Sequence, residues 1–444
     1  MIATYGLNRQ PQQDERADVT QSQASVAFNG PDLRGNDLSR NTSSCDDGAA
    51  VPDAAVNDVG RLACARLTLS NFRCYEHLRL EPGLNPVVLT GANGAGKTNI
   101  LEALSFLVPG SGLRRARLSD VGRRDLGADQ GRAWAVAADI KGGAFPVSVG
   151  TGIETAAKTA AAAKRVVHVD GAPQRALSVL SEHFAAQWLT PQMDRLFLDG
   201  SQERRRFLDR LVFGFDPAHA GRINAYNHAL RERSRLLADG KNDDAWLSAL
   251  EDTMATRGMA VAAARLGVAE RLAGACAHMN GPFPASTLAI DGLAEGWLMD
   301  HPALAVEDRL RAALKRSRAA DAAHGGAGNG LDGRLPHQSD LLVTHAAKAM
   351  PAGQCSTGEQ KMLLVGLVLA AARLSASDEG RTPVLLLDEV AAHLDVRHRD
   401  ALFDEVLTLG CQAWFTGTDA ELFAPLSGKA KFYSIDDAKL AEGH

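Results

Sequence analysis

The segment GANGAGKTN, residues 91–99, places glycines, a lysine and a threonine at the spacing G-x-x-x-x-G-K-[ST]. Glycines let backbone N–H groups turn inward around phosphates, and the positive end of a following helix adds to the attraction. Lys97 is suited to neutralise β and γ oxygens, and Thr98 to offer a hydroxyl to Mg²⁺. A glycine-rich turn that fits by accident is the alternative. The pattern predicts a site for ATP and Mg²⁺ made by Gly91, Ala92, Asn93, Gly94, Ala95, Gly96, Lys97, Thr98 and Asn99.

Two acidic residues follow the apolar run of the segment PVLLLDEV. Asp388 is expected to hold Mg²⁺ through water, opposite Thr98, and Glu389 to orient or deprotonate an attacking water. Glu389 and Lys97 are therefore the catalytic candidates. Two acids at a strand end are also typical of a solvated edge, and the phosphate loop upstream favours the functional interpretation.

A third motif, CSTGEQK at 355–361, lies about 30 residues before Asp388 and opens an apolar helix. It resembles the signature motif of ABC-type ATPases, in which a serine and a glycine at a helix start bind the γ-phosphate held by the opposite subunit. Ser356 and Gly358 are the matching residues. Helix capping of the type Ser/Thr-x-x-Gln explains the same residues without a ligand. The segment AAHLD, ending in Asp395, resembles the D-loop of that class.

Alternating and helical patterns surround these motifs. ARLTLSNF and NPVVLTG predict strands, TNILEALSFL predicts a helix, and AWAVAADI and FPVSVGTGI predict further strands. The alanine-rich stretch at 155–165 is expected to be a mobile hairpin tip or a short helix. Residues 200–320 are expected to be helical, with breaks at Asp216-Pro217, at 239–242 and at Gly281-Pro282.

The predicted fold class is α/β: an ABC-type P-loop ATPase head with an inserted helical arm. Residues 61–195 would begin the head, 196–325 would form the arm, and 326–444 would complete the head. Residues 1–60 contain nine Asp or Glu against four Lys or Arg and lack apolar periodicity. They are expected to be a disordered acidic leader, or the product of a start codon chosen too far upstream.

Composition indicates a reduced, cytoplasmic protein. Its 444 residues are 45% hydrophobic, enough for about two structural units. The six cysteines form no C-x-x-C pair, and no signal peptide opens the chain. The longest apolar stretch, MLLVGLVLAAA at 362–372, is shorter than the roughly 20 residues that span a bilayer, so we expect a buried helix and no membrane contact.

Residues 63–437 resemble the RecF family of recombination mediators. The resemblance rests on six segments that occur in this order: the phosphate loop, RRRFLDRLV, YNHALRERSRLL, PHQSDLL, CSTGEQK and LLLDEVAAHLD. The resemblance implies a monomer that dimerises around two ATP molecules, binds DNA near gaps and works with RecR and RecO to help RecA load where SSB coats the strand. It also implies that Arg73, in LSNFRCY, lies near the nucleotide. Gln192, in TPQMD, would be the Q-loop residue at the metal.

The chain departs from this pattern at several points. Thr357 and Glu359 replace the glycine and glutamine of the broader signature, and LPHQSDL lacks the usual start of its motif. No switch histidine follows AWFTGTD, so hydrolysis is expected to be slow, DNA-stimulated and switch-like. Other hypotheses are a nucleotide-binding subunit of a membrane transporter and a non-hydrolysing scaffold. The 291 positions between Lys97 and Asp388 exceed the usual transporter spacing, and the helices lack the heptads of a long coiled coil.

Two groups of arginines could contact DNA phosphates and give salt-dependent, sequence-independent binding to duplexes and gap junctions. The alternatives are a solvated face or internal pairing with Glu203 and Asp209. Few aromatic residues are interleaved, which favours contacts to a duplex backbone over stacking on single-strand bases. The groups are Arg114, Arg115, Arg117, Arg123 and Arg124, and Arg204, Arg205, Arg206 and Arg210.

Overall fold

The computed structural model describes residues 61–124, 131–142, 145–153, 164–240, 243–278 and 281–442. These residues fall within one compact unit. The predicted leader at 1–60 and most of the alanine-rich stretch lie outside the described residues.

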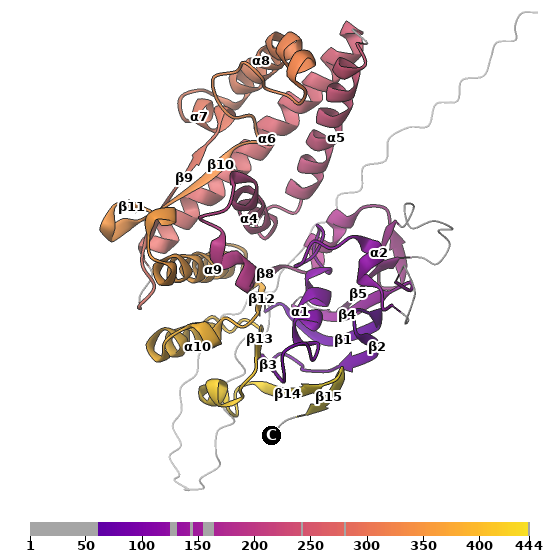
Figure 1. Cartoon of the computed structure of the whole chain (residues 1–444), viewed down its shortest axis with the longest axis vertical. Helices are drawn as coiled ribbons and strands as arrows, with labels where there is room; N and C mark the ends of the chain where they lie inside the picture. Colours follow the sequence, from indigo (N-terminus) through magenta and orange to yellow (C-terminus); the bar gives the residue numbers. More distant parts are fainter. Residues whose placement is uncertain are drawn as a thin grey trace, which may run out of the picture. The chain divides into compact units, whose positions relative to one another are not determined.

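A six-stranded, mostly parallel sheet forms the centre of the head (Figure 1). Its strands are nearly all apolar because both faces are covered. Alternate residues face two separate cores, with Leu385 and Phe415 on one side and Leu386 and Trp414 on the other. The order is β15 (Lys439–Glu442), β14 (Lys431–Asp436), β3 (Val87–Thr90), β13 (Ala413–Gly417), β12 (Val384–Leu387) and β8 (Ala186–Leu189), with β15 antiparallel.

An antiparallel sheet, drawn in indigo and violet in Figure 1, packs against the second of these cores through helix α1 (Lys97–Ser105). Its order is β2 (Tyr75–Leu80), β1 (Ala63–Phe72), β4 (Ala135–Lys141), β5 (Val147–Ile153), β6 (Arg165–Val169) and β7 (Ala172–Gln174). The predicted strands here are confirmed, and β5 pairs antiparallel with β6 across the alanine-rich stretch. Short helices α2 (Leu118–Val121), η2 (Leu177–Val179) and α3 (Leu180–His183) complete this lobe. Helix η3 (Pro191–Arg195) follows β8 of the central sheet.

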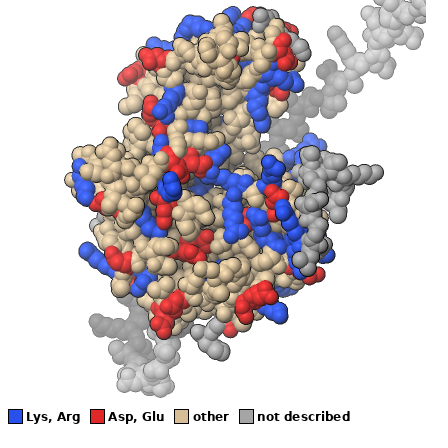
Figure 2. Space-filling view, in the orientation of Figure 1, with Lys and Arg blue, Asp and Glu red and all other residues tan. Residues whose placement is uncertain are grey.

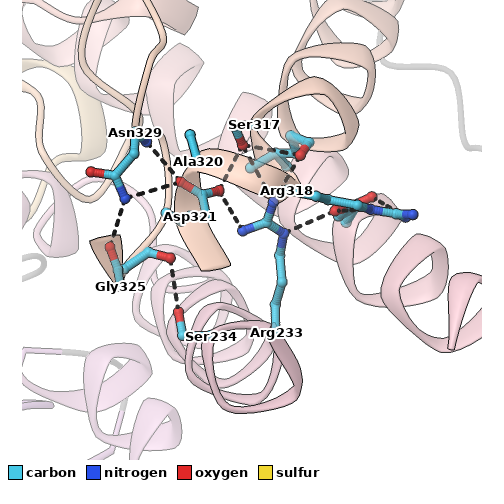
Figure 3. A network of polar contacts seen from close by, with 12 residues as sticks. Arg233, Ser234, Ser317, Arg318, Ala320, Asp321, Gly325 and Asn329 are labelled. Atoms are coloured by element: carbon cyan, nitrogen blue, oxygen red, sulfur yellow. Dashed lines mark hydrogen bonds and ion pairs between the residues drawn. The ribbon is translucent and has the colours of Figure 1, made fainter. Parts of the chain in front are cut away.

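The helical arm contains α4 (Ser201–Phe213), α5 (His219–Ala238), α6 (Asp244–Ala277), α7 (Leu293–Asp300) and α8 (Ala303–His324). The helices break where the sequence predicts. A buried guanidinium ties three of them together: Arg233 on α5 bonds to Glu251 on α6 at 2.9 Å and to Asp321 on α8 at 2.8 Å (Figure 3). Asp321 also accepts bonds from the backbone and side-chain N–H groups of Asn329, which fixes the loop after α8.

The expectation of helix throughout 200–320 is wrong at one place. Residues Ser286–Asp291 form strand β9, which pairs antiparallel with β10 (Asp340–His345), and β10 pairs with β11 (Met350–Pro351). The partner strand lies about 50 residues further along the chain, so the local sequence carries no sign of it. Tertiary pairing therefore decides the conformation of this segment.

Helices α9 (Thr357–Glu379) and α10 (Val396–Leu409) cover the face of the central sheet near the arm, with η4 (Ala346–Lys348), η5 (Ala352–Gln354), η6 (Ala391–His393) and η7 (Glu421–Leu426) between elements. Among the described residues, α9 alone is long and apolar enough to cross a membrane, but 67% of its apolar window is buried inside the protein. The predicted buried helix at 362–372 is confirmed.

Helix α6 belongs to two cores. Its second half, including Val268 and Leu272, packs into the core that contains α9 and the central sheet, while Met254 and Ala255 in its first half pack with α5 and α8. The base of the arm is thus continuous with the head. The domain limits drawn from sequence, 61–195, 196–325 and 326–444, stay a prediction.

Candidate nucleotide-binding site

The phosphate loop joins β3 to α1 and depends on glycine at two positions. Gly91 has a φ of 148°, and a Cβ there would collide with the carbonyl oxygen of Ile435 on β14. Gly96 has a φ of 118°, and its Cβ would stand 2.6 Å from the hydroxyl of Tyr75. Only glycine fits such backbone without strain. Ile435 and Tyr75, which pack directly against the loop, could not be predicted from the sequence pattern.

Lys97 folds back across the loop. Its Nζ donates to the carbonyl oxygens of Gly91 at 2.7 Å and Ala92 at 2.9 Å. Burial lowers the pKa of Lys97, and the carboxylates of Glu389 and Asp388 oppose that shift. The ammonium is therefore inside the loop, where phosphate oxygens are better acceptors than neutral carbonyls.

The two motifs that are far apart in the sequence meet at Asp388. Thr98 Oγ1 and Thr416 Oγ1 each donate to Asp388 Oδ1 at 2.8 Å. Burial raises the pKa of Asp388, and the two hydrogen bonds oppose that shift. Thr98 and Asp388 offer the hard oxygen ligands that Mg²⁺ takes from proteins, with water and substrate phosphates completing its shell. The described residues hold no cluster of three or more His, Cys, Asp and Glu side chains, so a cation here would depend on the nucleotide.

Glu389 stands on a strained turn directly after β12. Its φ of 53° is in the left-handed region, which a non-glycine residue adopts only when its surroundings impose it. The backbone N–H of Glu389 donates to Thr416 Oγ1 at 2.9 Å, so one hydroxyl holds both acidic residues. Sequence reasoning missed Thr416. A threonine at the end of a strand parallel to β12 was the available signal.

Arg73 and Gln192 lie in different surroundings from Asp388. The guanidinium of Arg73 is paired with the buried carboxylate of Glu102, with Nε to Oε2 at 2.8 Å, and also donates to the carbonyl of Asp120. Gln192, on η3, lines a cavity of about 340 Å³ together with Arg114 and other side chains. In the described part of the chain, neither side chain has a hydrogen bond to Thr98 or Asp388. Their predicted contacts with nucleotide and metal stay predictions.

The signature segment is exposed at the start of α9. Ser356 is the N-cap of α9 and forms a capping box with Glu359. Helix capping, the alternative explanation of this segment, is therefore present. It uses Ser356 and Glu359 in place of Thr357 and Gln360. The ammonium of Lys348 and the N–H of Ser356 hold the pKa of Glu359 at about 2. Gly358 has no atom within 4 Å of where a Cβ would stand. Its open surface leaves room for a ligand besides the cap.

Asp395, the D-loop residue by resemblance, is the N-cap of α10. Its carboxylate accepts from the backbone N–H of His398 at 2.9 Å. No hydrogen bond or ion pair among the described residues joins Asp395 or Ser356 to the phosphate loop. Within one chain, the signature and the loop are therefore separate surfaces.

Most of the arginines singled out from the sequence have partners inside the protein. On α4, Arg204 pairs with Asp340 at 2.8 and 2.9 Å, and Arg206 pairs with Glu203 at 2.8 Å. The remaining contacts are Arg205 to the carbonyl of Ser339, Arg210 to the carbonyl of Trp188, Arg114 to Asn99, Arg115 to Glu203, Arg123 to Glu76 and Arg124 to Asp120. Asp209 pairs with Arg265 and His219 instead of its neighbours on α4. Internal pairing of these arginines is thus frequent. In an exposed pair, however, the arginine can exchange its carboxylate partner for a phosphate.

The fold and this site define an ABC-type P-loop head with an inserted helical arm. Residues 63–431 match the family described as RecF/RecN/SMC N terminal domain. The chain belongs to the RecF family of DNA replication and repair proteins. It is 48% identical to RecF of Mesorhizobium japonicum over 374 residues, covering 84% of this chain and 96% of that protein. The identity with RecF of Caulobacter vibrioides is also 48%, over 393 residues, covering 85% and 97%.

Two solved structures have the same fold. The recombination mediator protein RecF described as RecF-ATPrS in the RecFOR pathway superposes with a TM-score of 0.74 at 19% identity, covering 87% of this chain and 99% of that one. The form described as RecF-ATP superposes with a TM-score of 0.70 at 21% identity, covering 86% and 99%.

Proposed function

We propose that this protein is an ATP-dependent DNA-binding switch of recombinational repair. The observation that carries the proposal is the hydrogen bond between Thr98 and Asp388, because it joins the phosphate loop to the acidic strand end in a geometry suited to Mg²⁺·ATP. Membership of the RecF family and the ATP-containing forms of RecF with the same fold support it.

ATP would close a dimer of two chains. Ser356 and Gly358 are exposed and have no contact with the phosphate loop of the same chain, whereas a second copy can bring them against a bound γ-phosphate. Each nucleotide would then be held by two chains, so dimerisation would require ATP. Hydrolysis would remove the γ-phosphate and open the dimer.

The chain's own residues divide the chemistry. Lys97 exchanges the carbonyls of Gly91 and Ala92 for phosphate oxygens, which are stronger acceptors. Thr98 and Asp388 would hold Mg²⁺, which would supply positive charge to stabilise the phosphate groups. Glu389 orients a water and accepts its proton. The strand end after Thr416 lacks a switch histidine, which is consistent with slow, DNA-stimulated turnover.

The partners follow from the family. We expect the closed dimer to bind duplex DNA and gap junctions through backbone phosphates, and to act with RecR and RecO in loading RecA. Relatives are named DNA replication and repair proteins, and the similar structures are assigned to the RecFOR pathway. A protein with these activities would act in the cytoplasm, where the DNA is.

Fluorescence anisotropy of a labelled gapped duplex tests the proposal. Protein is titrated with ATP and then with ADP, each at two salt concentrations. We expect tighter binding with ATP that weakens steeply with salt, because phosphate contacts release counterions. Equal binding with both nucleotides would remove the switch. No binding with either would contradict direct DNA binding by this chain and point to a partner that must deliver the DNA.

A further inference from the structure

A cavity of about 770 Å³ lies outside the nucleotide site, among α4, α5, α6 and the loop 109–112 that follows α1. Three sequence segments that the ATP site leaves unused converge on it: RRRFLDRLV, YNHALRERSRLL and PHQSDLL. Figure 2 shows Lys and Arg side chains concentrated where α4 comes close to the lobe that contains α1 and α2. The cavity's polar and aromatic lining includes Arg115, Trp188, Arg205, Arg206, Asp209, Arg210, Phe213, Asn224, Tyr226, Asn227, Arg265 and His337.

The lining carries five arginines and a single carboxylate, that of Asp209. Asp209 is already neutralised, because it accepts from Arg265 at 2.8 and 2.9 Å and contacts His219 at 3.0 Å. Two more carboxylates lie outside this cavity: Arg115 and Arg206 share Glu203, and Arg265 also pairs with Glu295 at 3.7 Å. The cations therefore outnumber the anions that face them.

Arg205 and Arg210 have no ion pair within the described chain. Arg205 donates to the carbonyl oxygen of Ser339 at 2.7 Å. Arg210 is only 9% exposed, donates to the carbonyl oxygen of Trp188 at 3.0 Å and stacks on that ring at 4.2 Å, while its Nε has no partner. Burial, and then the neighbouring Arg115, lower the pKa of Arg210 to about 9. A buried cation without a counter-ion is costly unless an anion joins it.

The opposite side of the cavity suits a planar, polar group. The rings of Tyr226 and His337 lie with centroids 5.8 Å apart, joined by a hydrogen bond of 2.9 Å between the phenol oxygen and Nδ1. The amides of Asn224 and Asn227 add donors and acceptors. The volume falls in the range of about 300 to 1,000 Å³ that small-molecule sites occupy.

We propose that this cavity is a second phosphate site, which binds a nucleotidyl phosphate independently of the phosphate loop. Arg205, Arg206 and Arg210 receive the phosphate, and the base or sugar lies toward Tyr226. Arg206 exchanges its bond to Glu203 for the ligand. The phosphate belongs either to a free nucleotide-like anion or to a nucleic acid strand, which share the chemistry recognised here.

Isothermal titration at low salt tests the proposal on full-length Lys97→Ala protein without Mg²⁺, so that binding at the phosphate loop is weakened, and the cavity variants below assign the binding that remains. The probes are pyrophosphate, the dinucleotide pdTpdT, which carries a 5′-phosphate and a phosphodiester, and thymidine, which carries no phosphate. We expect pyrophosphate or pdTpdT to bind, and thymidine to bind at least tenfold more weakly than either. Tighter binding of pdTpdT identifies nucleic acid as the source, and equal or tighter binding of pyrophosphate identifies a free anion.

Two added variants test the location. Arg206→Gln removes a cation with little other contact, and Asn224→Trp fills the cavity from an exposed position. Each should weaken binding at least tenfold, whereas Arg235→Gln, an exposed arginine of α5 outside the cavity, should not. Dissociation constants above about 1 mM for every probe, or constants unchanged in both cavity variants, would overturn the proposal. The ATP-dependent assay on gapped DNA is unaffected by that outcome, so the two proposals fail separately.

Discussion

Thr98 donates its hydroxyl hydrogen to Asp388 over 2.8 Å, although 290 positions separate the two residues. The contact brings together the ends of β3 and β12, which flank β13 in the central sheet. Because Thr416 on β13 donates to the same oxygen, three strands converge on one carboxylate. The phosphate loop and the two acidic residues are therefore linked through the hydroxyl groups of Thr98 and Thr416.

Replacing Lys97 with alanine should weaken ATP binding by a factor of about 10 to 100. Charge-assisted hydrogen bonds to phosphate contribute about 1.5 to 3 kcal/mol, and the variant loses them. Equilibrium titration with a fluorescent ATP analogue measures the change. Lys429→Ala, at an exposed position away from the loop, is the matched control and should keep wild-type affinity. Equal affinity in both variants would contradict the assignment of Lys97.

Thr416→Val should reduce ATP turnover more than ATP binding. Valine keeps the shape but leaves the N–H of Glu389 without its acceptor and Asp388 with only one of its two donors, Thr98, so both acids lose alignment. We also expect a loss of about 1 to 3 kcal/mol in the free energy of unfolding. Phosphate release and urea denaturation give the two quantities. Thr418→Val, exposed two residues later, should change neither.

Gly358→Asp should abolish ATP-dependent dimerisation without harming the fold. The position is open, and an acid in the first turn of α9 is favourable to the helix dipole, but its charge would face the γ-phosphate held by the other chain. Light scattering with ATP reports the dimer, and thermal denaturation the fold. Gly221→Asp places the same charge in the open first turn of α5 and should dimerise normally. A Gly358→Asp protein that still dimerises would remove the signature from the interface.

Stability should fall as pH drops from about 6.5 to about 4, partly because of His337. Burial, and then the charge of Arg205, lower the pKa of His337 from 6.5 to about 4. The unfolded chain therefore takes up a proton in this window before the folded chain does, and this stabilising contribution is intact above it. Urea denaturation at a series of pH values should show a shallower decline for His337→Gln. The exposed His228→Gln is the control, and an identical decline in all three proteins would contradict the prediction.

Arg233→Met should destabilise the arm by about 3 to 5 kcal/mol, because it leaves the buried carboxylate of Asp321 without a cation and that of Glu251 with Arg318 alone (Figure 3). Urea denaturation followed by circular dichroism measures the loss. Arg235→Met, two residues along α5 and 62% exposed, removes a surface pair with Glu232 and should cost less than about 1 kcal/mol. Similar losses in the two variants would show that the network contributes little.

The sequence predicts the centre of the head well, because local signals there agree. An apolar run followed by a glycine loop and a helical period specifies β3 and α1, and four apolar residues before two acids specify β12. Membership of the RecF family is likewise readable from motifs spread over the chain. These features depend on residues close together in the sequence.

Contacts between distant residues account for what the sequence does not predict. The pairing of Arg73 with Glu102, the strand β9, and the burial of Arg210 against Trp188 each require a partner many positions away. A run of arginines such as 204–206 is compatible with a DNA-binding face and with buried structural cations. Only the fold distinguishes the members whose charge is already paired, such as Arg204, from those whose charge is not.

Helix α6 extends from the core of the head into the arm. Its second half is fixed in the core of the head, and its first half carries the arm out to the half-exposed ring of Trp246. The 17 residues of its first half, at 1.5 Å each, extend about 26 Å beyond the fixed half, so a tilt of about 10° at the middle of the helix would displace its far end by about 4 Å. A small change in the angle of α6 near the head would therefore move the end of the arm by several ångströms. Such a movement is large enough to make or break a contact with another macromolecule.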